Sequence, residues 1–388
     1  MAAQCWTLWD EQQGTHRERL RLGETHLGEA LEGCEILHRR LEGGLSDGVD
    51  VVRIQCGQLV VELLPTRGMG IGRAWIGGEP IGWQSPVPGP VHPKFMCLAD
   101  PSGLGWLDGF DEWLVRCGLE SNGAPEFDRQ GRLKYPLHGL IANRPAQRVQ
   151  VQADSETGEI SVIGVVEETR FLFRKLRMTS TVTLKAGELA LRVRDEVQNR
   201  SAVATEMQML YHINFGPPLL GPGARFVAPV RRVVPRDPRA VEGLTTWSRY
   251  ADAEAGFAEQ VYFLELLGDT RENTLALLRN ADQDRGVSLR IDRRQLPWFT
   301  LWKNTASHAD GYVTGLEPGT NFPNPRSFEG SHGRVVALEP DATATFDLRM
   351  EFHRDADSVQ QVEQAISDIR GTQSPEVCDQ PQADWCVV

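Results

Sequence analysis

Short stretches in which apolar and polar residues alternate, separated by polar turns, fill most of this chain. Alternation at period two is typical of strands that have one face in a core and the other in solvent. Short connections favour antiparallel neighbours. The pattern therefore predicts an all-β protein, a large antiparallel sandwich with a few peripheral helices. The strands expected in the middle and later parts are 148–153, 159–167, 171–184, 189–197, 205–214, 261–267, 274–279, 287–291, 299–303, 335–338 and 343–352.

Two segments have the composition of tight hairpin turns. Cys56-Gly57 separates the apolar runs 50–55 and 58–64, and the polar segment 185–188 joins two further strands. Glycine in such short connections allows the positive φ that hairpin turns require. Residues 65–146, by contrast, are dominated by loops, and a loop region of this size in a compact protein is usually functional.

The two ends of the chain carry helical patterns. Residues 27–41 repeat apolar positions at helical spacing and end at Gly43-Gly44, and a second helix is predicted from Ser358, as N-cap, to Gly371. The apolar face of this second helix consists of Val359, Val362, Ile366 and Ile369. We expect three parts: a partly helical N-terminal extension (1–45), the sandwich (46–354), and the C-terminal helix with a loose tail (355–388).

The composition narrows the classes of partner. The net charge is -12, from 53 acidic and 41 basic residues, and no Lys/Arg run is long enough to follow a phosphate backbone, which argues against nucleic acid. No apolar stretch approaches the roughly 18 residues of a membrane span. The seven cysteines are scattered without a Cys-x-x-Cys pair, and the N-terminus lacks a secretory signal pattern. We therefore predict a cytoplasmic protein with free thiols. A homodimer is left open.

Glu317 stands alone after the apolar run 312–316 and before a segment rich in Pro, Gly and Asn, 318–326. A carboxylate at a strand-to-loop junction is held by rigid backbone, which is how a scaffold presents a general base. The alternative is a glutamate that only caps or pins the loop.

Three further segments place polar side chains at similar junctions. His138 is followed by a glycine, His212 and Asn214 lie two positions apart and hence on one side of a strand, and Arg67 follows the run 58–64. A single histidine is more often a hydrogen-bonded structural residue than a catalyst. Two histidines, an arginine and a glutamate in matching positions favour a site.

These residues resemble those of a known family. The order His138-Gly139, then Tyr211-His212-Ile213-Asn214-Phe215, then Glu317 before a polar loop is similar to the aldose 1-epimerases, or galactose mutarotase-like proteins. Segments 65–70, 105–110, 117–123 and 317–321 are similar to an uncharacterised bacterial branch of that superfamily. The resemblance extends from about residue 45 to residue 353.

The resemblance implies a β-supersandwich whose concave face binds a sugar, and a mutarotase activity on an aldose or a modified or acidic sugar. Glu317 would take the proton of the anomeric hydroxyl while His212 protonates the ring oxygen, so that the ring opens and recloses as the other anomer. His138 would lie beside the ring oxygen or a neighbouring hydroxyl, and Arg67 matches the substrate-binding arginine by position only. Neither a cofactor nor a metal is implied. The sugar is left open, because no motif matches the aspartate that commonly contacts sugar hydroxyls.

Other residues are candidates for contacts with the sugar, and each has a structural alternative. Trp302 is a candidate for stacking on a pyranose, or an ordinary core residue. Lys303 and Arg326 are candidates for holding an acidic group, or solvated cations. The candidates for hydrogen bonds to hydroxyls are Glu120, Asn122, Asn214, Asn321 and His92.

Two other functions fit the same residues. His138, His212, Glu120 and Glu317 carry nitrogen and oxygen ligands for a divalent metal, although none of the usual short spacings is present, and such a site would suit a metal-dependent sugar isomerase or lyase. A non-catalytic carbohydrate-binding protein would keep the cleft without turnover.

Overall fold

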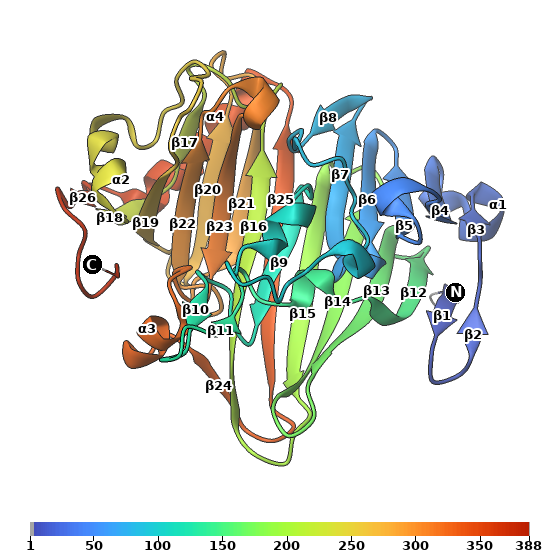
Figure 1. Ribbon diagram of the computed structural model, residues 1–388. Helices are drawn as coiled ribbons and strands as arrows, with labels where there is room; N and C mark the ends of the chain where they lie inside the picture. Colours follow the sequence, from blue (N-terminus) through green and yellow to red (C-terminus); the bar gives the residue numbers. More distant parts are fainter. Residues whose placement is uncertain (1–3, 388) are drawn as a thin grey trace.

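The computed structural model describes residues 4–387, and two large sheets packed face to face dominate it (Figure 1). Residues 1–3 of the predicted extension and residue 388 of the predicted tail lie outside this range. The all-β prediction is confirmed. The first sheet has ten strands in the order β17 (Arg225–Val227), β20 (Asn273–Arg279), β21 (Gly286–Asp292), β25 (Thr343–His353), β15 (Ala190–Asn199), β14 (Lys175–Lys185), β13 (Glu159–Thr169), β12 (Ala146–Asp154), β1 (Gln4–Asp10) and β2 (Thr15–His16).

The second sheet has fourteen strands. Its main order is β26 (Glu376–Val377), β18 (Val230–Pro235), β19 (Gln260–Leu266), β22 (Trp298–Asn304), β23 (Val313–Gly319), β16 (Thr205–Phe215), β9 (Leu114–Leu119), β7 (Gly70–Ile76), β6 (Leu59–Leu64), β5 (Asp50–Cys56), β4 (Cys34–Arg40) and β3 (Leu20–Leu22). Two short strands lie off this path, β24 (Val336–Leu338) on β16 and β8 (Glu79–Ile81) on β7, and β10 (Glu126–Phe127) pairs separately with β11 (Leu133–Tyr135). Both predicted hairpins, β5–β6 and β14–β15, are present.

The burial of the strands shows where the second sheet is covered. In β14 buried and half-buried positions alternate along the strand, as expected for a sheet with one face in the core. In β16 every residue from Met207 to Phe215 is buried, and so is all of β23. A second layer must therefore cover the outer face of these two strands.

That second layer comes from the loop region between β7 and β12. A short turn of 3-10 helix, Gly105–Gly109, and the loops around it lie over β9 and β16 (Figure 1). The apolar residues of this cover pack against the sheet as one cluster of Trp106, Phe110, Val115, Cys117, Ala142 and Leu210. His212 lies in β16, and Glu317 lies in the neighbouring strand β23.

The predicted helix at 27–41 is wrong. Only Glu24–Leu27 (α1) and a 3-10 turn, Glu29–Leu31, are helical, and Cys34–Arg40 forms strand β4. Cys34, Ile36 and His38 are buried at alternate positions, and the strand pairs with β5. The segment therefore follows the two-residue repeat of a strand and not the helical spacing of its apolar residues.

The C-terminal helix is confirmed as α4 (Ala356–Arg370), which ends at Gly371. Its N-cap is Asp355 rather than Ser358, because the Asp355 side chain accepts a hydrogen bond from the Ser358 backbone N–H. The other helices are α2 (Pro238–Glu242) and α3 (Arg326–Ser331). No helix within residues 4–387 is long and apolar enough to span a membrane.

The tail after α4 is not loose. Strand β26 pairs in parallel with β18, and Trp385 and Cys386 are buried in a cluster that includes Phe322. Trp385 lies 4.8 Å from Phe322, centroid to centroid. The tail is therefore held in place by the apolar cluster that it completes with Trp385 and Cys386.

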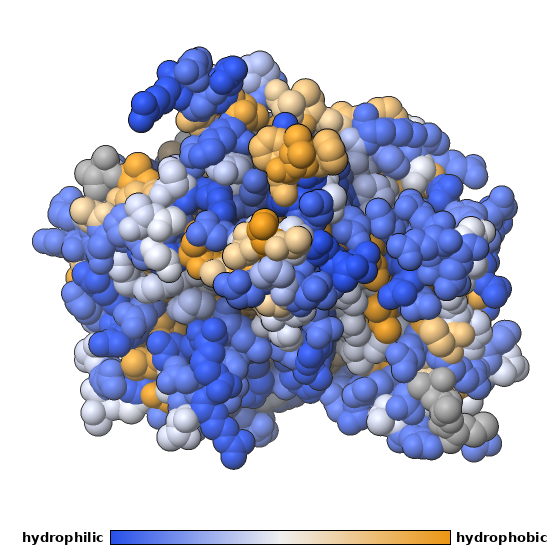
Figure 2. Space-filling view, turned by 90° about the horizontal axis from the view of Figure 1, so that it is seen from below, coloured by the Kyte–Doolittle hydropathy of each residue, from blue (hydrophilic) through white to orange (hydrophobic). Residues whose placement is uncertain are grey.

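The turn between β13 and β14 exposes three successive apolar side chains, Phe171, Leu172 and Phe173. The turn lies at the lower end of the sheets in Figure 1. Figure 2, seen from that side, shows a largely hydrophilic face on which apolar side chains gather near the middle.

Candidate active site

Glu317 and His212 face each other across two neighbouring strands. In the pairing of β16 with β23, Ile213 is opposite Leu316, so the residues one step further along meet as well. Glu317 Oε1 lies 3.2 Å from His212 Nε2, and the two residues are only 2% and 5% exposed. The approach is not aligned as a hydrogen bond, which leaves Oε1 buried without a partner. A buried polar atom without a partner calls for an explanation, and a catalytic role is one of them.

His138 completes a group of three polar side chains. Its ring meets that of His212 edge-on, with centroids 5.5 Å apart. The residue has a positive φ of 57°, and the carbonyl oxygen of Asn122 lies 3.0 Å from its Nδ1. Because a carbonyl only accepts, Nδ1 carries the proton and Nε2 is left as an acceptor.

Aromatic side chains surround the histidines. The Trp302 and Phe110 rings lie 5.4 and 5.2 Å from the His212 ring, and Trp106 lies 4.5 Å from His138. Trp302 is thus where a stacking residue is expected, whereas Trp106 and Phe110 were not predicted as site residues. The available signal was that both lie in segment 105–110, one of those that carry the family resemblance.

Burial controls the protonation of the pair. Burial raises the pKa of the Glu317 carboxyl well above its ordinary value, Glu259 raises it further, and Arg236 partly offsets this. Burial, assisted by His138, lowers the pKa of His212 to about 3, and burial lowers that of His138 to about 4. At neutral pH both histidines are therefore uncharged, and burial shifts the Glu317 carboxyl toward its protonated form.

Glu259 and Arg236 lie at the solvent side of the site. One Glu259 oxygen accepts from Trp302 Nε1 at 2.7 Å, and the other lies 2.9 Å from Arg236 Nη2. Arg236 also pairs with Asp237. Sequence reasoning missed this group because charged loop residues follow no pattern that marks a site.

Gly315 leaves the space that the pair occupies. A Cβ at this position would lie 2.5 Å from Glu317 Oε1 and 3.0 Å from His212 Cε1. No side chain fits there unless the pair moves.

Comparison with known proteins shows the family to which the chain belongs. The family model described as "Domain of unknown function (DUF4432)" matches residues 46–352. A solved structure from Klebsiella pneumoniae subsp. pneumoniae, that of a protein named "putative aldose 1-epimerase", is 36% identical, covers 98% of this chain and 99% of its own, and superposes with a TM-score of 0.95. The chain belongs to this DUF4432 family. No curated protein matches the sequence.

More distant structures show the fold of this DUF4432 protein. A galactose mutarotase-like protein from Clostridium acetobutylicum is 15% identical, with coverage of 81% of this chain and 97% of its own and a TM-score of 0.55. The galactose 1-epimerase from Lactobacillus acidophilus NCFM is 12% identical, with coverage of 82% and 98% and a TM-score of 0.54. The predicted galactose mutarotase-like sandwich is confirmed.

Arg67 of the DUF4432 protein does not reach the pair. Its guanidinium is fully buried and bonds to the Glu112 carboxylate, the Asn143 side chain and the Gly109 carbonyl. All three partners are in the loop layer, which Arg67 thereby ties to the end of β6. The geometry is that of a scaffold residue rather than of a sugar contact.

Asn214 contacts His212 instead of facing the open side of the site. It is fully buried, and its Oδ1 lies 2.6 Å from His212 Nδ1. Its Nδ2 donates to the Glu112 carbonyl. Asn122 and Asn321 pair through their side-chain amides, below the carbonyl that holds His138. All three asparagines already have hydrogen-bond partners in the empty site.

The predicted cations and outer residues also have other partners. Lys303 Nζ donates to the backbone carbonyls of Thr246 and Arg249. Arg326 binds the Glu120 carbonyl and Glu206. The Glu120 carboxylate pairs with Arg174, and His92 Nδ1 accepts from the Lys94 backbone N–H.

The metal-binding alternative needed Glu120 beside the two histidines, and the structure places it with Arg174 instead. Within residues 4–387 no group of three or more His, Cys, Asp or Glu side chains is arranged to hold a metal ion.

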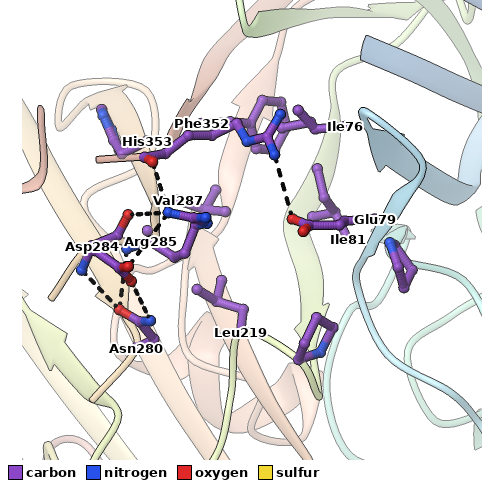
Figure 3. A pocket seen from close by; sticks show the side chains of 14 residues that line it. Ile76, Glu79, Ile81, Leu219, Asn280, Asp284, Arg285, Val287, Phe352 and His353 are labelled. Carbon is purple, nitrogen blue, oxygen red and sulfur yellow. Dashed lines mark hydrogen bonds and ion pairs between the residues drawn. The ribbon is translucent and has the colours of Figure 1, made fainter. Parts of the chain in front are cut away.

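A separate hollow of about 450 Å³ lies between the β7–β8 hairpin and strands β21 and β25 (Figure 3). Its floor is apolar, with Ile76, Val287 and Phe352. Figure 3 shows Asn280, Asp284 and Arg285 along one side and Glu79 on the other. None of the predicted site residues lines this hollow.

Proposed function

We propose that the protein is a mutarotase that interconverts the α and β anomers of an aldose, with Glu317 and His212 as its acid–base pair. The observation that carries the proposal is the buried Oε1 of Glu317, without a hydrogen-bond partner and 3.2 Å from Nε2 of His212. The reaction needs one group that takes a proton and one that gives a proton, both close to one small polyol. The family resemblance supports the same pair.

The proposed reaction transfers one proton from the sugar to Glu317 and one proton from His212 to the sugar. Glu317 takes the proton of the anomeric hydroxyl, the oxygen's electrons form the C=O bond, and the bond from C1 to the ring oxygen breaks as His212 protonates that oxygen. Rotation about C1–C2 and the reverse steps give the other anomer. Because burial favours the protonated form of Glu317 in the empty site, its proton must shift to His212 before ring opening. Hydroxyls of a bound sugar that donate to the carboxylate favour that shift.

We propose an uncharged aldose rather than an acidic one. Lys303 and Arg326, the predicted contacts for an acidic group, bind elsewhere. Arg236, whose charge acts on Glu317, is already bonded to two carboxylates, Glu259 and Asp237. These three side chains together carry a net negative charge, which repels an anionic sugar. Trp302 and His138 remain the proposed sugar contacts.

The test is the rate of anomer exchange, measured by NMR across neutral aldoses and uronates. The wild type should accelerate exchange of at least one neutral aldose, and Glu317→Gln should not. Glu79→Gln, a carboxylate at the hollow of Figure 3, is the matched control and should behave as the wild type. Equal acceleration by wild type and Glu317→Gln across the panel contradicts the proposal.

The same samples separate the alternatives. Sugar binding without turnover in both proteins supports a carbohydrate-binding protein, and activity lost on chelation supports a metal-dependent isomerase or lyase. The homodimer and the cytoplasmic location stay predictions.

A further inference from the structure

The side-chain amide of Asn214 can take only one orientation. Its Nδ2 lies 3.0 Å from the Glu112 carbonyl oxygen and 3.4 Å from the His212 carbonyl oxygen. Both carbonyls only accept hydrogen bonds, so the NH₂ group must face them. Turning the amide over would place Oδ1 against two carbonyl oxygens inside a fully buried site, where such repulsion is not screened.

This orientation fixes the tautomer of His212. With Nδ2 committed, Oδ1 is the atom 2.6 Å from His212 Nδ1. An amide oxygen is an acceptor, so Nδ1 must carry a proton. The other ring nitrogen, Nε2, then faces Glu317 with either a lone pair or a second proton.

The contact between the pair limits the number of protons. A bare Nε2 and an ionised Oε1, 3.2 Å apart and buried, would place two lone pairs against each other. Protonating both would leave a buried positive charge without a counter-ion on the pair. With one proton between them, the pair is neutral overall, as an uncharged His212 with protonated Glu317 or as the corresponding ion pair.

We infer that Asn214 is a positioning residue that keeps the Nδ1 proton of His212 turned away from Glu317, so that Nε2 and Oε1 hold one exchangeable proton between them. For its catalytic consequence, the inference rests on the proposed function, since a pair with one proton can give one and take one at the same sugar. The positions of the protons do not depend on the proposed function, because they can be measured without a substrate.

Other charged and titratable groups face the pair from each neighbouring element. They are His138 in the loop cover, Cys117 in β9, Glu259 before β19 and Arg236 after β18. Glu259 and Arg236 oppose each other in their effect on Glu317, and His138 is uncharged at neutral pH. The hydrogen-bond partner of His212 Nδ1 is Asn214 rather than any of these groups. The tautomer therefore depends on Asn214.

The experiment reads the protons directly in the ligand-free full-length protein at neutral pH. Nitrogen NMR of ¹⁵N-histidine reports each ring nitrogen of His212, and carbon NMR of ¹³C-glutamate reports whether Glu317 is ionised. Signals are assigned with His212→Gln and Glu317→Gln. We expect a protonated Nδ1 and one proton in total on Nε2 and Glu317.

Two substitutions at position 214 should differ in their effect on the protons. Asn214→Leu removes the acceptor, so the proton should leave Nδ1 and appear on Nε2, and turnover should fall roughly 10–100-fold, as when other orienting partners of a histidine are lost. Asn214→Asp keeps an acceptor for Nδ1, but its second oxygen must hold a proton to face the Glu112 and His212 carbonyls, so no charge is added and the wild-type proton positions should persist.

A second histidine gives the matched control. His353 Nε2 lies 2.8 Å from Ser288 Oγ in the other sheet. Ser288→Ala should alter the His353 signals and leave those of His212 and the turnover unchanged.

Several results overturn the inference: a bare Nδ1 in the wild type, two protons or none on the Nε2–Glu317 pair, or the wild-type tautomer persisting in Asn214→Leu. If Asn214→Leu does not fold, Asn214→Ala, which also removes the acceptor, decides, and a proton that stays on Nδ1 there contradicts the inference. Predicted proton positions without anomer exchange on any sugar uphold the inference and reject only the proposed function.

Discussion

The pair site and the hollow of Figure 3 differ in how their polar groups are satisfied. In the hollow, Arg354 bonds to Gln58 and pairs with Glu79, and Arg285 donates to the Arg354 carbonyl. At the pair, Oε1 of Glu317 is buried and has no hydrogen-bond partner. The hollow offers about 450 Å³ of open space, but its charged side chains already have partners. The pair has almost no exposed surface, yet it is the place where a substrate would supply a missing hydrogen bond. In this protein a buried polar atom without a partner is therefore a better sign of an active site than open volume.

The largest expected effect is that of Glu317→Gln on turnover. Replacing the carboxyl by an amide removes the proton transfer and keeps the shape, so the rate should fall about 10²–10⁴-fold, the range of a positioned general acid or base. NMR exchange of sugar anomers measures it. If the exchange rate falls by less than about twofold, Glu317 is not catalytic and the pair site is no better a candidate than the hollow.

A second prediction concerns stability at acid pH. The pKa of His138 is about 4 in the folded protein and about 6.5 when exposed, so between these values the unfolded chain binds a proton that the folded protein does not. Stability is therefore lost as pH falls through this window, by about 3 kcal/mol from this residue. Urea unfolding at pH 6.5 and 4.5 should show a smaller loss in His138→Gln than in wild type.

The exposed His16→Gln is the control for this measurement and should keep the wild-type pH dependence. If His138→Gln loses as much stability as wild type between the two pH values, the histidine is not held uncharged by burial.

Smaller shifts are expected from the two charged residues at the solvent side of the site. Glu259 raises the pKa of Glu317 and Arg236 lowers it. Glu259→Gln should therefore move the limb of the pH–rate profile that reports Glu317 to lower pH, and Arg236→Gln should move it to higher pH. Each rate at fixed pH should change within about tenfold, which corresponds to one pKa unit. Shifts in the same direction would contradict this electrostatic assignment.

The smallest effect is expected in the hollow. Arg354→Gln removes its contacts to Gln58 and Glu79 at the rim, and such surface changes usually cost within about 0.5 kcal/mol. Turnover should stay within about twofold of wild type in the same NMR assay. A loss comparable to that of Glu317→Gln would reverse the comparison.

The sequence predicted what depends on local periodicity. The alternation that defines the sheets also placed His212 and Asn214 on one side of a strand, and the structure shows them in contact. Arg67 and the end of the chain show the limit. Arg67 follows a strand as expected, but its partners Glu112 and Asn143 lie 45 and 76 residues away in sequence, so its burial could not be seen.

The same limit explains the tail and the aromatic cover. Trp385 has no periodic neighbours, and its place is determined by Phe322 and the other residues of their cluster. Trp106 and Phe110 lie in a loop, where no repeat tells which side chain turns inward. Contacts between distant segments complete the site, and a single sequence does not encode their pairing in any local pattern.

Gly315 gives a way to sort the relatives of this protein. Since one added carbon at this position would occupy the place of Glu317 Oε1, a natural sequence with a side chain there cannot hold the pair in this geometry. Members that keep the glycine together with both partners are candidates for the same activity. Members that have lost it, even with the glutamate and histidine intact, are expected to have diverged to another role.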